Sequence, residues 1–257
     1  MTFDEAYFAT HYGDYARQNP KRKLDWYVDQ ATRWIQTEPI RHLDVGCGPG
    51  AFVAHTARSP RFVTHGTDVS EFAIDQARGN APSAKLAVAC ADTRPWPDES
   101  FDLISALDVL EHLPDPGAAL DAFSSMLAPG GIVLAVMPVY DGLSGPIIRR
   151  LDSDPTHLHK WPRGKWLDLI GNHFELLDWH GAFRVLLPFG PYLHSRPESS
   201  GDTRPPSSSS AVAGPEFTRR RSGFPGRRRL CPRQVGDPAA LIAGPEPTTR
   251  ATLRTPH

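Results

Sequence analysis

The 257-residue sequence predicts an α/β protein built on a doubly wound, mostly parallel sheet with helices on both faces. Three observations predict this class. Strand-like and helix-like segments alternate from Ile40 to Val139, a glycine-rich stretch follows the first strand-like run, and Asp68 ends the second. Strands that alternate with helical patterns at this spacing are typical of βαβ units, whose helices bury both faces of the sheet.

Five strand-like runs and three helix-like runs make up this alternation. The strand-like runs are short and rich in apolar residues, as expected of strands that are buried on both faces. The expected strands are residues 40–47, 61–70, 84–92, 100–109 and 131–139, and the expected helices are residues 50–58, 71–80 and 116–131. Residues 164–181 predict one more helix followed by one more strand.

The regions on either side of the alternation differ from it. Residues 1–39 predict a helical lid segment that is broken at Pro20. Its aromatic cluster has helical spacing, and we expect Tyr12 or Tyr15 to edge a pocket in the main domain, residues 40–194. The other members of the cluster are Tyr7 and His11.

The last part of the chain, residues 195–257, has the composition of a disordered tail. It carries eleven arginines, no lysine and five acidic residues, a net charge of +6, whereas the preceding residues carry −7. Ten prolines, a four-serine run and no period of 2 or 3.6 predict disorder. A nucleic-acid-binding role through the arginine runs is the non-enzymatic alternative, but runs without interleaved aromatics are nonspecific, so nucleic acid is not the expected partner.

Membrane insertion and secretion are not predicted. No run of about 18 apolar residues is present, and that is the length a membrane-spanning helix needs. The first fifteen residues carry acidic side chains where a signal peptide needs basic ones, and no apolar stretch follows them. We therefore expect a cytoplasmic protein.

The stretch HLDVGCGPGAF (residues 42–52) joins the first strand to the first helix. Parallel sheets bind ligands at this end, and glycines let a ligand approach the backbone closely. A phosphate-binding P-loop requires Gly-Lys-Ser/Thr, whereas Ala51 and Phe52 follow Gly50 here. A dinucleotide-binding turn fits only if Ala51 replaces its last glycine, which leaves an NAD-dependent oxidoreductase as an alternative.

Several motifs in a fixed order resemble the class I S-adenosylmethionine (SAM)-dependent methyltransferases. They are LDVGCGPGAF, GTDVS, CADTRPWPDESFDLISALDVLEHL and LAPGGIVLAV, which together cover about residues 40–138 and continue more loosely to residue 181. The resemblance implies a Rossmann-like fold, SAM as the cofactor and methyl transfer as the reaction. Within the family, the sequence resembles the enzymes of quinone biosynthesis and related small-molecule methyltransferases.

The resemblance also implies roles for residues at the ends of the strands. Asp44 would help to hold the ammonium group of SAM, and the loop backbone would approach its methionine part. Asp68 would accept hydrogen bonds from the two ribose hydroxyls, a role that a carboxylate can fill because it has two acceptor oxygens. The predicted cofactor-binding residues are Asp44, Gly46, Gly48, Gly50, Asp68, Val69, Asp92, Thr93 and Leu107, of which Asp92 and Thr93 would lie near the adenine.

Candidate groups for the methyl acceptor follow the fourth and fifth strands. Asp108, Glu111 and His112 share one face of a helical turn, and His112 titrates near neutral pH. We predict Glu111, His112 and His157 as catalytic residues, with His157 on a loop that covers the acceptor site. We predict no metal, although carboxylates and an imidazole at this spacing permit one. In some relatives, small-RNA 2′-O-methyltransferases included, a similar triplet binds a divalent cation.

The same region excludes some classes of methyl acceptor. Enzymes that methylate exocyclic base amines resemble a (D/N/S)-P-P-(Y/F/W) pattern where this chain has Asp108-Val109-Leu110-Glu111, and the Pro-Cys pair of cytosine-C5 enzymes is absent from the sequence. We therefore expect a small-molecule acceptor, with the methyl going to a hydroxyl or carbon of an aromatic, quinone-like or lipidic metabolite. The sequence sets no oligomeric state.

The end of the sheet is the weakest part of the resemblance. Class I sheets usually finish with an antiparallel strand, and residues 183–190 (FRVLLPFG) are the only candidate, so that strand is missing or replaced. Arginine without lysine, together with Pro, Ser, Ala and Gly, is what a GC-rich gene encodes out of register. We therefore hypothesise a frameshifted or degenerate C-terminus, which the nucleotide sequence would test.

Overall fold

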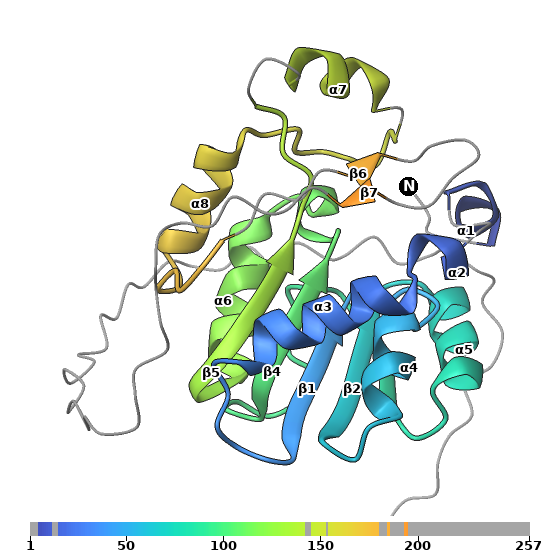
Figure 1. Ribbon diagram of the computed structural model, residues 1–257, viewed down its shortest axis with the longest axis vertical. Helices are drawn as coiled ribbons and strands as arrows, with labels where there is room; N and C mark the ends of the chain where they lie inside the picture. The colour runs from blue at the N-terminus through green and yellow to red at the C-terminus, as the bar shows by residue number, and fades with distance from the viewer. Residues whose placement is uncertain are drawn as a thin grey trace, which may run out of the picture. The chain divides into compact units, whose positions relative to one another are not determined.

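A five-stranded, fully parallel sheet forms the centre of the protein (Figure 1). The computed structural model describes residues 5–11, 15–141, 145–152, 154–179, 184–185 and 193–194. The strand order is β3-β2-β1-β4-β5, so the chain crosses from one edge of the sheet past β1 when it enters β4. The strands are β1 (Ile40–Val45), β2 (Phe62–Asp68), β3 (Lys85–Val88), β4 (Phe101–Leu107) and β5 (Leu127–Val136).

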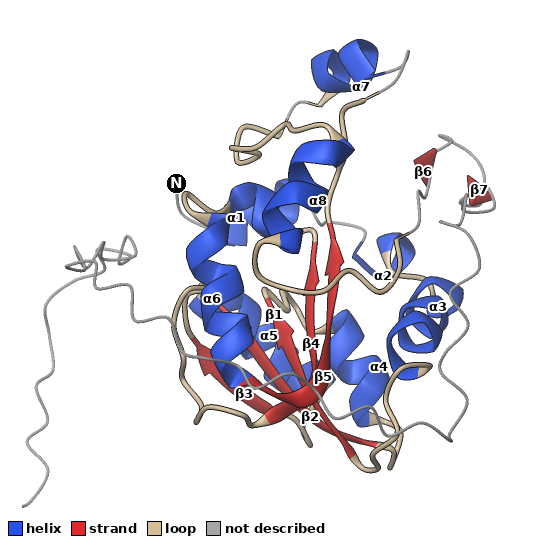
Figure 2. Ribbon diagram, turned by 90° about the vertical axis from the view of Figure 1, so that its left-hand side faces the viewer, coloured by secondary structure: helices blue, strands red, loops and turns tan. Residues whose placement is uncertain are grey.

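Helices cover both faces of this sheet. Figure 2 shows α6 on one side and α3 with α4 on the other. The helices are α1 (Glu5–His11), α2 (Tyr15–Gln18), α3 (Lys21–Thr32), α4 (Ala51–Ala57), α5 (Glu71–Asn80), α6 (Pro116–Met126), α7 (Gly145–Leu151) and α8 (Arg163–Gly171), with a 3₁₀ turn, η1, at Leu110–His112. The predicted α/β class with helices on both faces is confirmed.

The alternation of side chains along β1 divides the core into two layers. Leu43 and Val45 pack with α6 and with Trp166 of α8, which is 1% exposed. Ile40, His42 and Asp44 point to the other face, where Tyr27 of α3 packs with Phe52 of α4. Each large apolar side chain buried in this way contributes about 1.5–3 kcal/mol to folding. This face also buries polar groups of β1, which bear on the site below.

Pro20 acts at the N-terminus as the sequence predicts. It ends the first helical region and precedes α3, and its carbonyl accepts hydrogen bonds from the amides of Lys23 and Leu24. Helix α1 is tied to α5 through the Phe8 and Phe72 rings, whose centroids lie 5.8 Å apart. The N-terminal segment therefore lies at the carboxyl-end side of β1 and β2.

The start of the fifth strand was predicted wrongly. Helix α6 ends at Met126, and β5 begins at Leu127 rather than at residue 131. Phe101 pairs with Leu127, and Leu103 pairs with Ile132, so the stretch Ala-Pro-Gly-Gly forms a bulge. A bulge accommodates a proline and a glycine at positive φ within a strand, which is why the helix-stop signal lies inside the strand.

The strand predicted after α8 is also wrong. Residues 172–179 contain no strand in the part of the chain that the structure describes. Side-chain contacts hold the segment instead, because Arg33 donates to Asp178 at 2.7 Å and the Arg163 guanidinium lies 4.7 Å from the Trp179 ring. No strand among the described residues pairs with this segment, and an apolar run without such a partner does not become a strand.

The remaining C-terminal predictions fall largely on residues that the structure does not describe. Within 183–190, only β6 (Arg184–Val185) is described, and it pairs antiparallel with β7 (Leu193–His194) in a separate two-stranded sheet. The boundary near residue 195 and the predicted disorder of residues 195–257 lie outside the described residues. Of the helices that are described, none is long and apolar enough to cross a membrane.

Gly50, immediately before α4, offers a test of the helix packing. Its φ is +88°, and an added Cβ would lie 2.9 Å from Cβ and 3.0 Å from Cα of Ala77 in α5. We expect Gly50→Ala to lower the free energy of unfolding by about 1–3 kcal/mol, because the strained φ adds to a clash with backbone.

Gly79→Ala is the matched control, because an added Cβ on this exposed helical glycine meets nothing within 4 Å. It should leave stability unchanged or raise it by about 0.5–1 kcal/mol. Urea unfolding of both variants measures the difference. Equal stabilities for the two variants would contradict the packing of α4 on α5.

Candidate active site

The glycine loop lies at the carboxyl end of β1, between β2 and β4, where the strand order reverses. Doubly wound sheets bind their ligands at such a position. Gly46 has φ +68°, and an added Cβ would lie 2.4 Å from Cγ2 of Val109, so the loop lies directly against the segment after β4. Gly48 turns its amide toward β2, where it donates to Oδ2 of Asp68 at 2.9 Å.

Asp68 is buried at the end of β2, 8% exposed, and its two oxygens accept hydrogen bonds from the loop and from the start of α5. Oδ1 accepts from the Ser70 amide at 2.8 Å, and Oδ2 accepts from Gly48. Burial raises the pKa of Asp68, and these backbone hydrogen bonds oppose the rise. Each oxygen keeps a further acceptor site, so the carboxylate can also receive hydroxyl donors.

Asp44 is buried still more deeply, near the end of β1, with 2% of its surface exposed. The Ser105 hydroxyl of β4 donates to its Oδ1 at 2.6 Å. Burial raises the pKa of Asp44 to about 7, with a further rise from Asp68 and a decrease from the Ser105 hydrogen bond. The predicted pair of carboxylates therefore meets at one edge of the sheet, and both are held out of water.

The residues predicted for the adenine side occupy the neighbouring strand ends. Val69 follows Asp68 directly and is half-buried, and Leu107 ends β4 with a half-buried side chain. Asp92 and Thr93 are exposed in the turn after β3, where the Thr93 hydroxyl donates to the Cys90 carbonyl at 2.6 Å. These four residues lie at the same edge of the sheet as Asp44 and Asp68.

Tyr15 of α2 brings the N-terminal segment to the loop. Its hydroxyl accepts a hydrogen bond from the Ala51 amide at 3.3 Å and donates to the Cys47 carbonyl at 3.4 Å. Burial raises the pKa of Tyr15 well above its usual value. The prediction that Tyr12 or Tyr15 edges the site therefore fits Tyr15, whereas Tyr12 lies outside the described residues.

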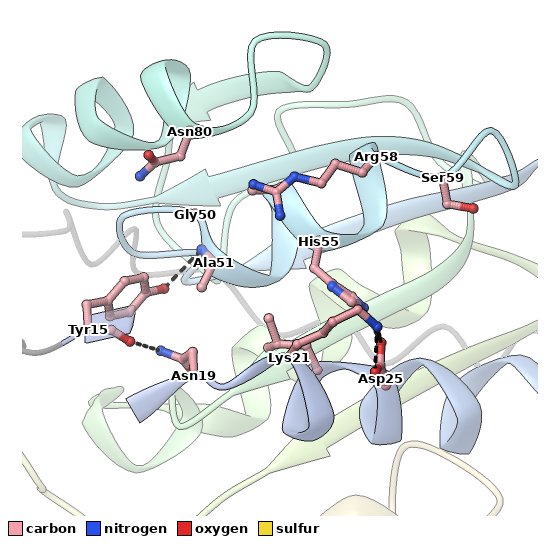
Figure 3. A pocket seen from close by; sticks show the side chains of 12 residues that line it. Tyr15, Asn19, Lys21, Asp25, Gly50, Ala51, His55, Arg58, Ser59 and Asn80 are labelled. Carbon is pink, nitrogen blue, oxygen red and sulfur yellow. Dashed lines mark hydrogen bonds and ion pairs between the residues drawn. The ribbon is translucent and has the colours of Figure 1, made fainter. Parts of the chain in front are cut away.

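A surface cavity of about 640 Å³ opens beside this contact (Figure 3). Tyr15 of α2, Asn19 between the two helices, and Lys21 and Asp25 of α3 line it, and α4 supplies the opposite wall. The predicted cofactor residues Asp44 and Asp68 do not line it. Gly50 is the only one of the predicted cofactor-binding residues among the described residues that line it, so we do not assign the cofactor to it.

The three predicted catalytic residues come together, although 45 positions separate two of them. Glu111 and Leu110 of η1 are fully buried, and the His112 and His157 rings lie 4.7 Å apart. Oε1 of Glu111 is 3.9 Å from Nε2 of His112 and 4.0 Å from Nε2 of His157. Burial and the nearby His157 lower the pKa of His112, which favours its neutral form.

A second layer of polar groups orients both imidazoles, and it was not among the predicted site residues. Nδ1 of His157 lies 2.8 Å from Oδ2 of Asp152, which also accepts from the Tyr140 hydroxyl. Burial raises the pKa of Asp152, but hydrogen bonds from Tyr140, His157 and Lys160 outweigh it and hold that pKa well below the usual range. The only signal in the sequence was the density of polar residues in DSDPTHLHK (residues 152–160).

The other imidazole is oriented in the same manner. Nδ1 of His112 lies 2.8 Å from the Thr156 hydroxyl, and this hydroxyl lies 2.5 Å from Oδ1 of Asp154. The amides of Leu158 and His159 both donate to the Glu111 carbonyl, at 2.9 and 3.1 Å. The segment after α7 is therefore fixed to η1 by backbone and side-chain hydrogen bonds together.

The atoms of this cluster also form a set that could hold a metal ion. Glu111, His112 and His157 each offer one ligand atom, and these atoms lie within 4.8 Å of one another. Hydrogen bonds from the outer nitrogens of both imidazoles to oxygen partners are typical of metal sites. Bonds of about 2.1 Å would place the ligand atoms roughly 3.0–3.4 Å apart, closer than the 3.9 and 4.0 Å described here.

Residues 15–182 match the family described as a methyltransferase domain. The match covers more than half of the chain and includes the glycine loop, both aspartates and the Glu111–His112–His157 cluster. The protein therefore belongs to the methyltransferase domain family, and this assignment replaces the dinucleotide-binding alternative.

Individual relatives agree with the family. A trans-aconitate 2-methyltransferase of Methylobacterium radiotolerans is 40% identical over 136 residues, 52% of this chain and 48% of the relative. One of Variovorax paradoxus is 31% identical over 185 residues, 66% of each chain. A ubiquinone biosynthesis O-methyltransferase of Alkalilimnicola ehrlichii is 36% identical over 121 residues, 45% of this chain and 47% of the relative. The chain thus spans about half to two thirds of the length of these curated relatives.

Solved structures confirm the fold. A SAM-dependent methyltransferase of Thermotoga maritima superposes with a TM-score of 0.57 at 18% identity and covers 74% of this chain and 90% of its own. The YcgJ protein of Bacillus subtilis gives a TM-score of 0.53 at 19% identity, with 64% and 74% covered. At these identities the likeness establishes the fold alone.

Asp44 allows a test of the electrostatics through stability. Its folded pKa, about 7, lies above the unfolded value of about 3.8, so the ionised form is disfavoured in the folded state. The contribution of Asp44 to the free energy of unfolding is therefore most favourable below about pH 4, and it is lost as the pH rises to 7. We expect Asp44→Asn to be more stable than wild type by about 2–4 kcal/mol at pH 8.

Urea unfolding of both proteins from pH 4 to pH 8 tests this expectation. The advantage of Asp44→Asn should grow between pH 4 and 7 and stay constant above pH 7. Asp102→Asn is the control of opposite sign, because the Arg41 hydrogen bonds lower the pKa of Asp102. A destabilised Asp44→Asn at pH 8 would contradict the burial described for this carboxylate.

Proposed function

We propose that this protein transfers the methyl group of SAM to an oxygen of a small, uncharged acceptor. The observation that carries the proposal is the placement of two charged centres at adjoining strand ends. Buried Asp44 and Asp68 adjoin the glycine loop, and the Glu111–His112–His157 cluster follows β4. The methyltransferase family and its small-molecule relatives support the reaction class.

On the cofactor side, the carboxylates match the charge of SAM. The SAM sulfonium and ammonium groups are cations, and two buried aspartates favour a cation over a neutral or anionic ligand. In this proposal Asp44 holds the ammonium group and Asp68 holds the ribose hydroxyls. Gly46, Gly48 and Gly50 give room to the methionine part, and Val69, Asp92, Thr93 and Leu107 surround the adenine. In-line methyl transfer then depends mainly on alignment, which can supply about 7–11 kcal/mol.

On the acceptor side, His157 is the proposed general base. A neutral hydroxyl must lose its proton during methylation, and a base within hydrogen-bond reach lowers the barrier. Asp152 binds Nδ1 of His157 at 2.8 Å, so it fixes the tautomer that leaves the Nε2 lone pair as the proton acceptor. Glu111 faces this nitrogen and stabilises the imidazolium that forms. The His112 ring lies beside the His157 ring.

The charge of this region favours a hydroxyl acceptor over a polyanion. Asp152 and Asp154 lie beside the His157 ring. Burial is outweighed by hydrogen bonds, which lower the pKa of both, so their negative charges would repel a tricarboxylate such as the one named for the trans-aconitate relatives. A phenolic or enolic hydroxyl carries no charge before the transfer. We therefore place the acceptor nearer to the hydroxylated substrates of the ubiquinone-biosynthesis relatives.

A binding experiment tests the cofactor side. We expect Asp68→Asn to weaken SAM binding by about 10–100-fold, because one charge-assisted acceptor of the ribose is lost. Isothermal titration of SAM into wild type and variant gives the ratio, and NAD(H) is the comparison ligand. Asp75→Asn, on the exposed surface of α5, should bind SAM like wild type. Tight binding of NAD(H) without SAM would end the proposal.

A transfer assay tests the acceptor side. With radiolabelled SAM, we expect catechol to be methylated and trans-aconitate not to be. His157→Gln should lower kcat by about 100-fold or more while SAM affinity stays within a factor of two, because only the proton acceptor is removed. His173→Gln, at a surface imidazole paired with Asp121, is the matched control. Methylation of trans-aconitate in preference to catechol would overturn the acceptor assignment.

A second role for the same cluster rests on its two oriented imidazoles and buried carboxylate. These groups would hold a divalent cation, which would lower the pKa of a bound acceptor hydroxyl. Dialysis against EDTA, followed by Mg²⁺, Mn²⁺ or Zn²⁺, separates the two roles. Activity that is unchanged by EDTA leaves His157 as the base, whereas a loss of tenfold or more that a cation reverses assigns the metal role.

A further inference from the structure

A continuous line of buried polar side chains crosses the face of the sheet beneath α4 and ends on Asp44. Each member is at most 5% exposed, so no bulk water is available to these groups. The line runs from Thr64 in β2 through Thr56 in α4, His42 in β1 and Ser105 in β4 to Asp44. Its successive heavy-atom distances are 3.2, 3.2, 2.8 and 2.6 Å.

Chemistry fixes the direction of this hydrogen-bond line. An ionised Asp44 only accepts, so the Ser105 hydroxyl donates its single proton to Oδ1. The same hydroxyl then accepts from His42, which must carry its proton on Nε2. Nδ1 of His42 is left as an acceptor that faces the Thr56 hydroxyl. The Thr56 proton is shared with the Phe52 and Val53 carbonyls, both 3.2 Å away.

Packing alone does not account for a histidine at this position. The His42 ring lies between Phe52 and Phe62, with centroids 5.2 and 6.1 Å away, where an apolar side chain would pack without any polar cost. A buried polar group costs free energy unless it is hydrogen-bonded. Both ring nitrogens are bonded, and burial lowers the pKa of His42 to about 3, so the ring stays neutral and remains a donor to Ser105.

We propose that His42 and Ser105 are positioning residues for Asp44: they favour its ionised form and bond Oδ1, so that Oδ2 is left for the ammonium group of the cofactor. The functional part of this inference rests on the proposed SAM site, whereas the hydrogen-bond line itself does not. His42 lies two positions before Asp44 in β1, and Ser105 lies in the neighbouring strand β4. Neither residue is among the site residues predicted from the sequence.

Among the residues that the structure describes, the other groups that face Asp44 bring no compensating charge. Asp68 of β2 raises its pKa, and Ser105 of β4 lowers it. Tyr15 of α2 and Cys47 of the loop also face it, and burial raises the pKa of both, so they are neutral. His42 of β1 acts through Ser105 and is neutral as well. The donor from Ser105 therefore decides how much of Asp44 is ionised near neutral pH.

The first experiment needs no cofactor. Protein labelled with ¹³C at the aspartate carboxyls is titrated by NMR, and Asp44 is assigned by the loss of its signal in Asp44→Asn. We expect Ser105→Ala to raise the midpoint of Asp44 by about one pH unit, the worth of one hydrogen bond to a charge. His42→Leu should raise it by a smaller amount, and His42→Gln, which keeps a donor for Ser105, should restore it.

His65→Leu is the matched control for the histidine. His65 lies in the neighbouring strand and is buried against the rings of Trp96 and Phe101, and its hydrogen bond to His42 is made to the backbone, not to the ring. It should leave the midpoint of Asp44 unchanged. If His42→Leu does not fold, Ser105→Ala decides alone. An Asp44 midpoint that is the same in wild type, Ser105→Ala and His42→Leu overturns the positioning role.

The second experiment measures SAM affinity against pH. If the midpoint moves from 7 to 8, the ionised fraction at pH 7 falls about fivefold, so Ser105→Ala should bind SAM about fivefold more weakly at pH 7. This loss should diminish as the pH approaches 9. A loss that is the same at both pH values overturns the ionisation part of the role. A wild type that binds no SAM overturns the proposed function, and the NMR midpoints still decide the positioning role.

Discussion

Burial of two neighbouring carboxylates at the carboxyl end of the sheet is the constraint on which the rest of the site depends. Burial raises the pKa of both Asp44 and Asp68, and the nearby Asp68 raises the pKa of Asp44 further, so ionisation of the pair is costly. The structure offsets this cost with donors from three directions. The Ser105 hydroxyl donates a hydrogen bond to Asp44, and the Ser70 and Gly48 amides donate to Asp68. The Gly48 amide reaches Asp68 only because the loop takes a positive-φ path, so loop shape and carboxylate position depend on each other.

On the acceptor side, hydrogen bonds between segments that are far apart in the sequence hold the site together. Glu111 and His157 are far apart in sequence, and the segment that carries His157 is attached to η1 through the Glu111 carbonyl. His159 adds a contact from its Nε2 to the Leu113 carbonyl at 2.8 Å. Tyr7 of α1 lies 3.4 Å from the Thr156 hydroxyl, so the N-terminal segment reaches this cluster as well as the loop. Movement of either segment would therefore alter the spacing of the imidazoles.

Sequence alone predicted the parts of this arrangement that are local. The periodicity of β1, β2 and β4, the helix between Glu71 and Asn80, and the break at Pro20 follow from apolar pattern, capping and proline chemistry. The strand ends that carry Asp44 and Asp68 follow from the same pattern. The bulge in β5 was not predictable, because Pro-Gly-Gly indicates a helix stop equally well. The prediction of a strand within residues 172–179 was wrong for a related reason, since a strand needs a partner that its own sequence does not specify.

Contacts between site residues that come from different strands and loops could not be predicted from local sequence patterns. No spacing rule links Asp152 to His157 as an orienting pair, or Ser105 to Asp44, because strand register and loop docking bring them together. His42 is the clearest case. In the sequence it is a polar residue within an apolar strand, and only the register of β1 with β4 shows why a polar residue is stable there.

A site built on buried carboxylates also has a consequence for turnover in the proposed reaction. In this proposal Asp44 holds the ammonium group of SAM and of the product alike, whereas methyl transfer removes the positive charge of the sulfonium. The negative potential of the two buried aspartates would therefore favour the sulfonium over the thioether that remains after the transfer. The same burial that makes the empty site costly to fold therefore favours binding of the charged cofactor and release of the neutral thioether.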